Sequence, residues 1–329
     1  MEYWNNVVTG AHNPKNTQGR GMPLFDPSPV TSIRDPELRA QLERLGRRIE
    51  ALPWPEKEPT SSSAKVIQLP LFPRETRPIS NDMARSALFS CIQGKDRRYI
   101  EDALLASQDG AEIRFTGKQL NQDDHDLLMT LVFMAQHKPL GAWVTLSAYT
   151  ILTALGRQTG GLQYRELRAD ISRLAAGMVS IRNAKAKIEF IGHHLIAKAI
   201  QAEVSRHWIY RLDPDLRSLY GEMTHTLIDW EKRRALQGKD LARWLQLYIA
   251  SHAKPFPVKV ATLKELSGSR AKQLKNFRTQ LRKALDDLVV NKDIQDWMIE
   301  MPHDLVKVDR GEAITGSQRR SIDLKKPRI

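Results

Sequence analysis

Residues 262–308 read TLKELSGSRAKQLKNFRTQLRKALDDLVVNKDIQDWMIEMPHDLVKV, and this stretch decides the fold that we expect. Thr262 and Glu265 have the spacing of a capping box, which predicts the start of a short helix. Gly268 follows and suits a tight turn. A long helix is predicted over 270–290, because apolar residues recur there at helical spacing: Leu274, Phe277, Leu281, Leu285 and Leu288.

Two short strands are predicted after this helix. Residues 294–301 and 305–308 alternate in polarity, and Pro302 lies in the turn between them. A further helix is predicted upstream over 239–252, and Pro255 breaks it. The order of helix, short helix, tight turn, long helix and hairpin is that of a winged-helix domain.

The same order of elements is predicted earlier in the chain. A helix over 147–155 is stopped by Gly156, and a second helix covers 162–178. Residues 187–191 alternate like half of a hairpin whose turn is near Asn183, and 208–212 is another strand candidate. The order of the elements matches but their amino-acid sequences do not, so two unrelated helical domains remain the alternative.

We therefore expect a mainly α fold with short β hairpins (α+β), built as two tandem winged-helix domains after a partly disordered N-terminal arm. The arm is residues 1–77, and the domains are 78–225 and 226–329, the second with a basic C-terminal tail. Within the arm, residues 1–33 show no hydrophobic period and 52–64 form a Pro- and Ser-rich linker.

One helix is predicted inside the arm, over 36–51. Asp35-Pro36 is a helix start, and Leu38, Leu42, Leu45 and Ile49 then share one face. This stripe must dock on the body of the protein or on a second copy. We take self-association or autoinhibition as the hypothesis for this helix.

The charge of the chain indicates a polyanionic partner. Its 329 residues carry a net charge of +13, which favours nucleic acid or an anionic membrane surface. No run of 18 apolar residues occurs, and the N-terminus lacks the pattern of a signal peptide. Cys91 is the single cysteine, which fits a reducing cytoplasm. We expect a cytoplasmic protein that binds nucleic acid and no membrane.

The helix 270–290 is the stronger candidate for reading DNA. Between Leu266 and Leu285 there are six basic residues and no acid. Lysine suits phosphate, and Asn276 can pair bidentately with adenine. The alternative is a solvated basic face, although such faces usually mix charges of both signs. The expected DNA contacts of this region are Arg270, Lys272, Lys275, Asn276, Thr279, Arg282 and Lys283.

The helix 162–178 is the second candidate. It is less basic, and Glu166 and Asp170 share it, but a carboxylate can accept a hydrogen bond from cytosine. The next segment, 182–187, is a basic wing suited to backbone or minor-groove contact. The expected contacts here are Arg165, Arg168, Ser172, Arg173, Lys185 and Lys187.

Catalytic motifs are missing from the sequence. There is no P-loop, and His193 and His194 are adjacent, which is not the spacing of a rolling-circle nickase. Asp123, Asp124 and Asp126 could bind a metal, but carboxylates at a helix start are expected for the helix dipole alone. We expect no enzyme activity, no cofactor and no metal.

Two segments carry a resemblance to a known family. Asn81-Asp82-x-Ala84-Arg85-Ser86-Ala87-Leu88-Phe89 follows a short apolar motif, and YRELRADISRL at 164–174 follows a small helix. From about residue 66 to about 310 the chain resembles the TrfA family of plasmid replication initiators. The resemblance implies binding to direct repeats (iterons) in a plasmid origin, opening of an AT-rich region with capture of single-stranded DNA, and the host proteins DnaA and DnaB as partners.

The apolar motif before residue 81 is also similar to a known peptide. Gln68-Leu69-Pro70-Leu71-Phe72 resembles the peptide with which bacterial proteins bind the sliding clamp of the replicative polymerase. The resemblance makes Gln68, Leu69, Leu71 and Phe72 clamp contacts, with Leu and Phe as apolar anchors. The alternative is an apolar segment that docks on its own domain. A winged-helix transcriptional repressor is the competing function, and such a protein has no use for this peptide.

Overall fold

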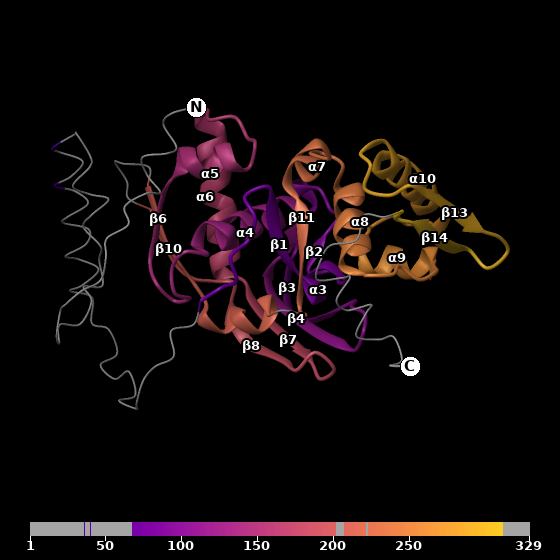
Figure 1. Ribbon diagram of the computed structural model, residues 1–329, viewed down its shortest axis with the longest axis horizontal. Helices are drawn as coiled ribbons and strands as arrows, with labels where there is room; N and C mark the ends of the chain where they lie inside the picture. Colours follow the sequence, from indigo (N-terminus) through magenta and orange to yellow (C-terminus); the bar gives the residue numbers. More distant parts are fainter. Residues whose placement is uncertain (1–35, 37–39, 41–67, 202–206, 222, 312–329) are drawn as a thin grey trace, which may run out of the picture. The chain divides into compact units, whose positions relative to one another are not determined.

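The computed structural model of the chain separates into two compact units, residues 1–57 and 58–329. The structure describes residues 36, 40, 68–201, 207–221 and 223–311 (Figure 1). The expected disorder of 1–33, the linker and the C-terminal tail lie outside the described residues. Of the predicted helix 36–51 only Pro36 and Ala40 are described, and both are helical.

The first part of the described unit mixes helices and strands. Its elements, in chain order, are β1 (Thr76–Ser80), α3 (Asn81–Ala84), β2 (Phe89–Ser90), η2 (Gly94–Asp96), β3 (Tyr99–Leu105), β4 (Ala111–Lys118), β5 (Leu120–Asn121), α4 (Gln122–Ala135), β6 (Val144–Ser147), α5 (Ala148–Ala154), α6 (Gly161–Ala176), β7 (Met178–Asn183), β8 (Ile188–His194), β9 (Ile196–Gln201), β10 (His207–Leu212), η3 (Pro214–Tyr220) and β11 (His225–Asp229).

Most of these strands pair in antiparallel sheets. The largest sheet has the order β3-β4-β7-β8, and a second has the order β6-β10-β9. Strand β1 pairs with β11 from Thr76 opposite Asp229 to Ser80 opposite His225. The domain boundary predicted between 225 and 226 therefore falls inside a strand, and the first core continues through Ile228 and Trp230.

The second part contains α7 (Trp230–Ala235), α8 (Asp240–Ser251), β12 (Val258–Lys259), α9 (Val260–Leu266), α10 (Leu274–Val290), β13 (Asp296–Glu300) and β14 (Leu305–Asp309). Its three strands form a sheet in the order β12-β14-β13. Figure 1 shows α8, α9, α10 and this hairpin grouped together at the orange-to-yellow end of the colour range. The described chain is thus an α+β protein, as expected. The expected predominance of helices with only short hairpins is wrong, because strands as long as β4 pair in a four-stranded sheet.

The predicted inward face of the long helix is confirmed. Phe277, Leu281, Leu285 and Leu288 are fully buried in one apolar cluster, while Leu274 is only partly buried. Burying side chains of this size stabilises the fold by about 1.5–3 kcal/mol each. This apolar stripe sets the rotation of α10 and therefore decides which of its residues face solvent.

Two predicted details of the second part are wrong. Helix α9 begins at Val260 after the cap residue Lys259, so Thr262 lies inside the helix and caps nothing. The reason is tertiary, because Val258 and Lys259 pair with β14 and the chain turns into the helix directly from this strand. Helix α10 begins at Leu274 and not at 270. Gly268 does form the tight turn, with a φ of 61°.

A buried charged junction joins the two parts of the unit. Arg233 Nε lies 2.7 Å from Asp126 Oδ1, and Arg243 Nη2 lies 2.5 Å from Asp126 Oδ2. Arg243 Nη1 also pairs with Asp123 at 2.8 Å. Burial alone would raise the pKa of Asp126, but the two guanidinium groups hold it below its ordinary value. Helix α4 of the first part is thereby fixed to α7 and α8 of the second.

Within the described ranges, no helix combines the length and the apolar character that a membrane span requires.

Candidate nucleic-acid interface

Helix α10 presents a polar, positively charged face to solvent. Its buried residues occupy one side, and the other side carries exposed side chains of types that bind phosphate or bases. Of the contacts predicted there, the exposed ones are Lys272, Lys275, Asn276, Thr279, Arg282 and Lys283, together with Arg270. Lys272 and Arg270 lie in the loop before α10, so the face extends beyond the N-terminus of the helix.

Two arginines of this region are engaged by the protein itself. Arg278 binds Asp304 through two hydrogen bonds, of 2.9 and 2.8 Å, which tie α10 to the turn between β13 and β14. The Arg270 guanidinium donates to the backbone oxygen of Asp96 and to the side chain of Gln119. Arg270 therefore anchors the start of the α10 region to the first part, in addition to being exposed.

Helix α6 places three of its four predicted contacts in solvent. Arg165, Arg168 and Ser172 are exposed. The prediction for Arg173 is wrong, because its side chain is only 9% exposed and its Nε donates to Asp124 Oδ1 at 3.0 Å. Its Nη2 also pairs with Asp170. Asp124 is buried in α4, so Arg173 is directed into the fold and away from any DNA.

A chain of charges surrounds this arginine. Arg97 pairs with the second oxygen of Asp124 at 2.9 Å, and Arg157 pairs with Asp170 at 2.8 Å. Burial alone would lower the pKa of Arg173, but the carboxylates of Asp124 and Asp170 raise it above its ordinary value. Arg173 therefore stays charged inside the protein, where its pair with Asp124 holds α6 against α4.

The three aspartates considered as metal ligands serve this packing instead. Asp123 and Asp126 bind arginines from α8 and α7, and Asp124 binds Arg173. Asp124 also accepts the backbone N–H of Asn121 at 2.9 Å, while the Asn121 side chain accepts from the helix start. This reciprocal capping box opens α4. The sequence indicated carboxylates at a helix start but carried no signal for their distant partners.

The hairpin after α6 presents the two lysines predicted for a wing. Lys185 and Lys187 are exposed in the turn between β7 and β8. Asn183 anchors the turn from below, because its Oδ1 accepts from the Ala186 N–H at 3.2 Å and its Nδ2 donates to Asp82 at 2.9 Å. These two hydrogen bonds of Asn183 fix the conformation of the turn that carries the lysines.

The segment 68–72 docks on its own domain. Leu69 and Phe72 are 5% and 6% exposed and belong to the first core, and the Phe72 N–H donates to Gln136 Oε1 at 2.6 Å. Gln68 Nε2 donates to the backbone oxygen of Gln136 at 3.2 Å. The expectation of a free peptide is therefore wrong for Leu69 and Phe72. Of the three apolar clamp contacts that the sequence predicted, only Leu71 is open to solvent, with an exposure of 67%.

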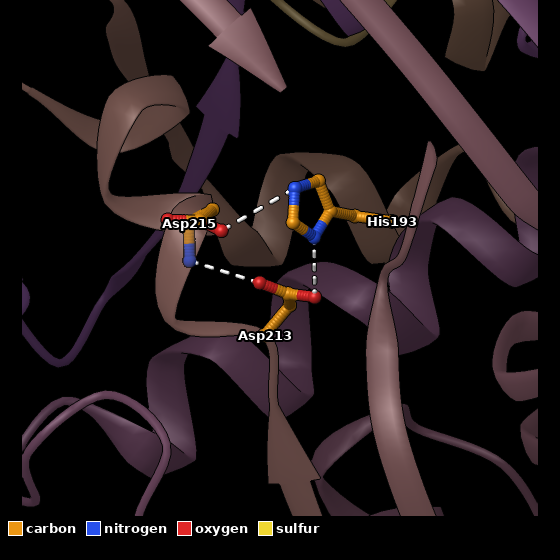
Figure 2. Close-up of side chains that lie close together, drawn as sticks. All are labelled: His193, Asp213 and Asp215. Carbon is orange, nitrogen blue, oxygen red and sulfur yellow. Dashed lines mark hydrogen bonds and ion pairs between the residues drawn. The ribbon is translucent and has the colours of Figure 1, made fainter. Parts of the chain in front are cut away.

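A histidine of β8, His193, lies between the carboxylates of Asp213 and Asp215 (Figure 2). His193 Nδ1 is 3.0 Å from Asp213 Oδ2, and its Nε2 is 3.3 Å from Asp215 Oδ2. These residues are the one group in the described ranges with side chains close enough to hold a metal ion. The two ring nitrogens point to different carboxylates, and Asp213 also accepts from the Asp215 backbone N–H at 2.9 Å. The His193 ring therefore links β8 to the first turn of η3.

Comparisons with known proteins relate this chain to replication initiators. Residues 60–310 match the family described as "TrfA protein". The chain is 29% identical over 241 residues to the plasmid replication initiator protein TrfA of Escherichia coli, and the alignment covers 70% of this chain and 62% of that protein. The chain thus spans less than two thirds of the length of that relative.

Similar solved structures come from two other proteins. A crystal structure of the Pi initiator protein in complex with iteron DNA has a TM-score of 0.45 and 15% identity, covering 61% of this chain and 96% of that chain. A crystal structure of domains 2 and 3 of RctB has a TM-score of 0.47 and 14% identity, covering 70% of this chain and 99% of that chain.

Proposed function

Because this chain belongs to the TrfA family, we propose that it is a plasmid replication initiator that binds direct repeats in a plasmid origin. The observation that carries the proposal is the exposed face of α10, where lysines, an asparagine and a threonine are held outward by a buried apolar stripe. Lysine suits phosphate, and asparagine can distinguish adenine in the major groove. The protein works without catalytic machinery or cofactor, and the free energy for opening the origin comes from binding DNA.

We propose further that each part of the described unit is a winged-helix domain. The order of short helix, long helix and hairpin occurs as α5, α6, β7–β8 and again as α9, α10, β13–β14. The second set has a strand before its short helix, β12, that pairs with its own hairpin. In the first set the corresponding strand, β6, pairs with β10, and the hairpin pairs with β4. The first domain is thus the more elaborate of the two.

Protection of DNA from cleavage tests the proposed function. The full chain is bound to DNA that flanks its own gene, and regularly spaced protection over direct repeats is expected. Asn276→Ala should cost about 1–3 kcal/mol against the preferred base while random DNA is bound almost as before. Equal binding to repeats and to random DNA would refute an initiator. If the protected repeats lie only in a promoter and loss of the protein does not affect replication, the transcriptional repressor would be favoured.

We propose that the protein also binds host replication proteins. The family implies capture of the opened single strand and recruitment of DnaA, DnaB and the sliding clamp. For the clamp, Leu71 is the accessible anchor, and use of Leu69 or Phe72 requires the segment to leave the first core. Each of these buried side chains opposes that release by about 1.5–3 kcal/mol.

Two single variants test the clamp contact. Leu71→Ala should abolish clamp binding while duplex binding and the melting temperature stay unchanged, because Leu71 is exposed. Phe72→Ala should destabilise the fold by about 3–5 kcal/mol, because it leaves a cavity in the first core. A Leu71→Ala protein that binds the clamp as tightly as the natural chain would remove this part of the proposal.

A further inference from the structure

Helix α6 exposes two side chains that do not suit a phosphate-binding surface. Leu162, in the first turn of the helix, has 54% of its side chain in solvent. Glu166, one turn later, is also exposed and has no ion-pair partner in the part of the chain that the structure describes. Neither side chain contributes to the apolar core or to the arginine pairs that hold α6 in place.

The position of these residues limits what they can contact. The apolar residues that α6 buries are Leu167, Ile171 and Leu174, whereas Asp170, one turn after Glu166, is buried beside Arg157. Leu162 and Glu166 are exposed in the N-terminal two turns of the helix, at the edge of its buried side. Residues four apart on a helix are neighbours, with Cβ atoms about 5–6 Å apart. In helices that read DNA, the N-terminal residues contact the base edges in the major groove. Leu162 and Glu166 therefore face the groove together if α6 enters it.

The groove offers each of these side chains one fitting partner. A thymine presents a C5 methyl group, which an apolar side chain contacts favourably, and a cytosine presents an N4 amino group, from which a carboxylate accepts a hydrogen bond. Phosphate oxygens, by contrast, repel a carboxylate and gain nothing from a leucine. Arg165, also exposed and adjacent in the chain, supplies the positive charge that holds the helix near the backbone.

We propose that Leu162 and Glu166 determine the specificity of α6, Leu162 by contact with a thymine methyl group and Glu166 by accepting from a cytosine amino group. The spacing of the two side chains puts the two bases in the same or a neighbouring base-pair step, because the rise is about 3.4 Å per base pair. This inference rests on the proposed function, since it assigns the bases that one helix of the initiator reads.

The thymine contact is tested with DNA that lacks single methyl groups. A duplex carrying one protected repeat is prepared with each thymine replaced in turn by deoxyuridine, which removes only the C5 methyl. One replacement should weaken binding of the full chain by about threefold to tenfold, as expected for the removal of one buried methyl group. Leu162→Ala should weaken binding to the unmodified repeat by a similar factor and show no further weakening with that replacement.

The cytosine contact is tested by substitution of base pairs. The natural chain should discriminate strongly against replacement of one C·G pair close to the methyl-sensitive thymine. Glu166→Ala should tolerate all four base pairs at that place and keep its preferences elsewhere. Both residues are exposed, so the melting temperatures of the variants should match that of the natural chain.

Leu104→Ala provides the matched control, because Leu104 is 63% exposed but lies on β3, outside α6. It should keep the full response to deoxyuridine. Undiminished sensitivity of Leu162→Ala to every replacement would overturn the thymine contact. Repeats that are bound tightly with no methyl-sensitive position would overturn this inference and leave the initiator function standing. A natural chain that shows no preference for repeats would overturn both.

Discussion

Helices α6 and α10 each follow a short helix in the chain, yet they direct their positive charges differently. On α10, Lys275, Arg282 and Lys283 are exposed, and Arg278 is the one basic residue of the helix that binds an acid in the described structure. On α6, Arg173 is directed inward to Asp124. Counting basic residues along a helix therefore overestimates the charge that α6 offers to DNA, whereas for α10 the count is close to correct.

The difference follows from what each helix packs against. Helix α6 contacts α4, whose first turn carries the buried carboxylate of Asp124, which requires cationic partners. Helix α10 contacts α8 and α9 through apolar residues, so its cations are left for solvent. We therefore expect α10 to supply most of the electrostatic affinity for DNA, and α6 to supply mainly selectivity.

The largest expected effect concerns Arg173. Arg173→Ala should lower the free energy of unfolding by about 3 kcal/mol, because it removes one partner of a buried carboxylate while Arg97 remains. Urea unfolding measures this change. Arg168→Ala, an exposed arginine of the same helix, is the control and should stay within about 0.5 kcal/mol of the natural chain. If Arg173→Ala is fully stable but weak in DNA binding, the contrast between the helices is mistaken.

The second effect concerns the lysines of α10. Lys275→Ala with Lys283→Ala should weaken binding by on the order of 2 kcal/mol at low salt, to repeats and random DNA alike. The slope of log affinity against log salt should fall by roughly 0.9 for each phosphate that the protein no longer neutralises. Titrations at several salt concentrations measure both quantities. Lys275→Arg with Lys283→Arg keeps the charge and should retain the slope; an unchanged slope in the alanine variant would exclude α10 as the main phosphate-binding element.

The third effect is a pH-dependent change in stability that arises at the end of α8, the helix that packs against α10. His252 ends α8, and its Nδ1–H donates to the Tyr248 backbone oxygen at 2.7 Å. Burial, reinforced by the charge of Arg85, lowers the pKa of His252 to about 4, although Asp109 opposes this. The unfolded chain takes up a proton near pH 6.5 and the folded chain does not, so stability is lost as the pH falls from about 6.5 towards 4.

Between pH 6.5 and 5 this decrease in stability should amount to about 1–2 kcal/mol. Urea midpoints across this range measure it. His252→Gln should be less stable at pH 7 but decline less steeply on acidification, since the glutamine does not titrate. Parallel curves for the two proteins would show that His252 contributes nothing to the acid response.

The smallest effect is expected for the exposed arginines of α6. Arg165→Ala with Arg168→Ala should weaken repeat binding by about 1 kcal/mol, because exposed charges contribute little individually. Competition binding measures the affinity of this variant for repeat DNA relative to that of the α10 lysine variant. If its affinity falls further than that of the α10 variant, α6 and not α10 would supply most of the electrostatic affinity for DNA.

Prediction from the sequence succeeded where the pattern was local. The inward residues of α10, the turn at Gly268, the strand at 208–212 and the exposed lysines of the β7–β8 turn all follow from spacing within one element. It failed at Thr262 and at the domain boundary near residue 225, where pairing with a distant strand overrode the local signal. Hydrogen bonds to β14 and β1 decide those two points.

The sequence by itself determined the α+β class, the apolar stripe of α10 and the surplus of positive charge, because periodicity and composition act over a few residues. The tertiary structure alone decided that Arg173 turns inward to Asp124 and that Phe72 packs in the first core, with its N–H bonded to Gln136. These partners are 49 and 64 residues apart in the chain. Whether a cation or a phenyl ring meets solvent depends on which distant groups the folded chain brings beside it, since a buried carboxylate must be paired and an apolar cavity must be filled.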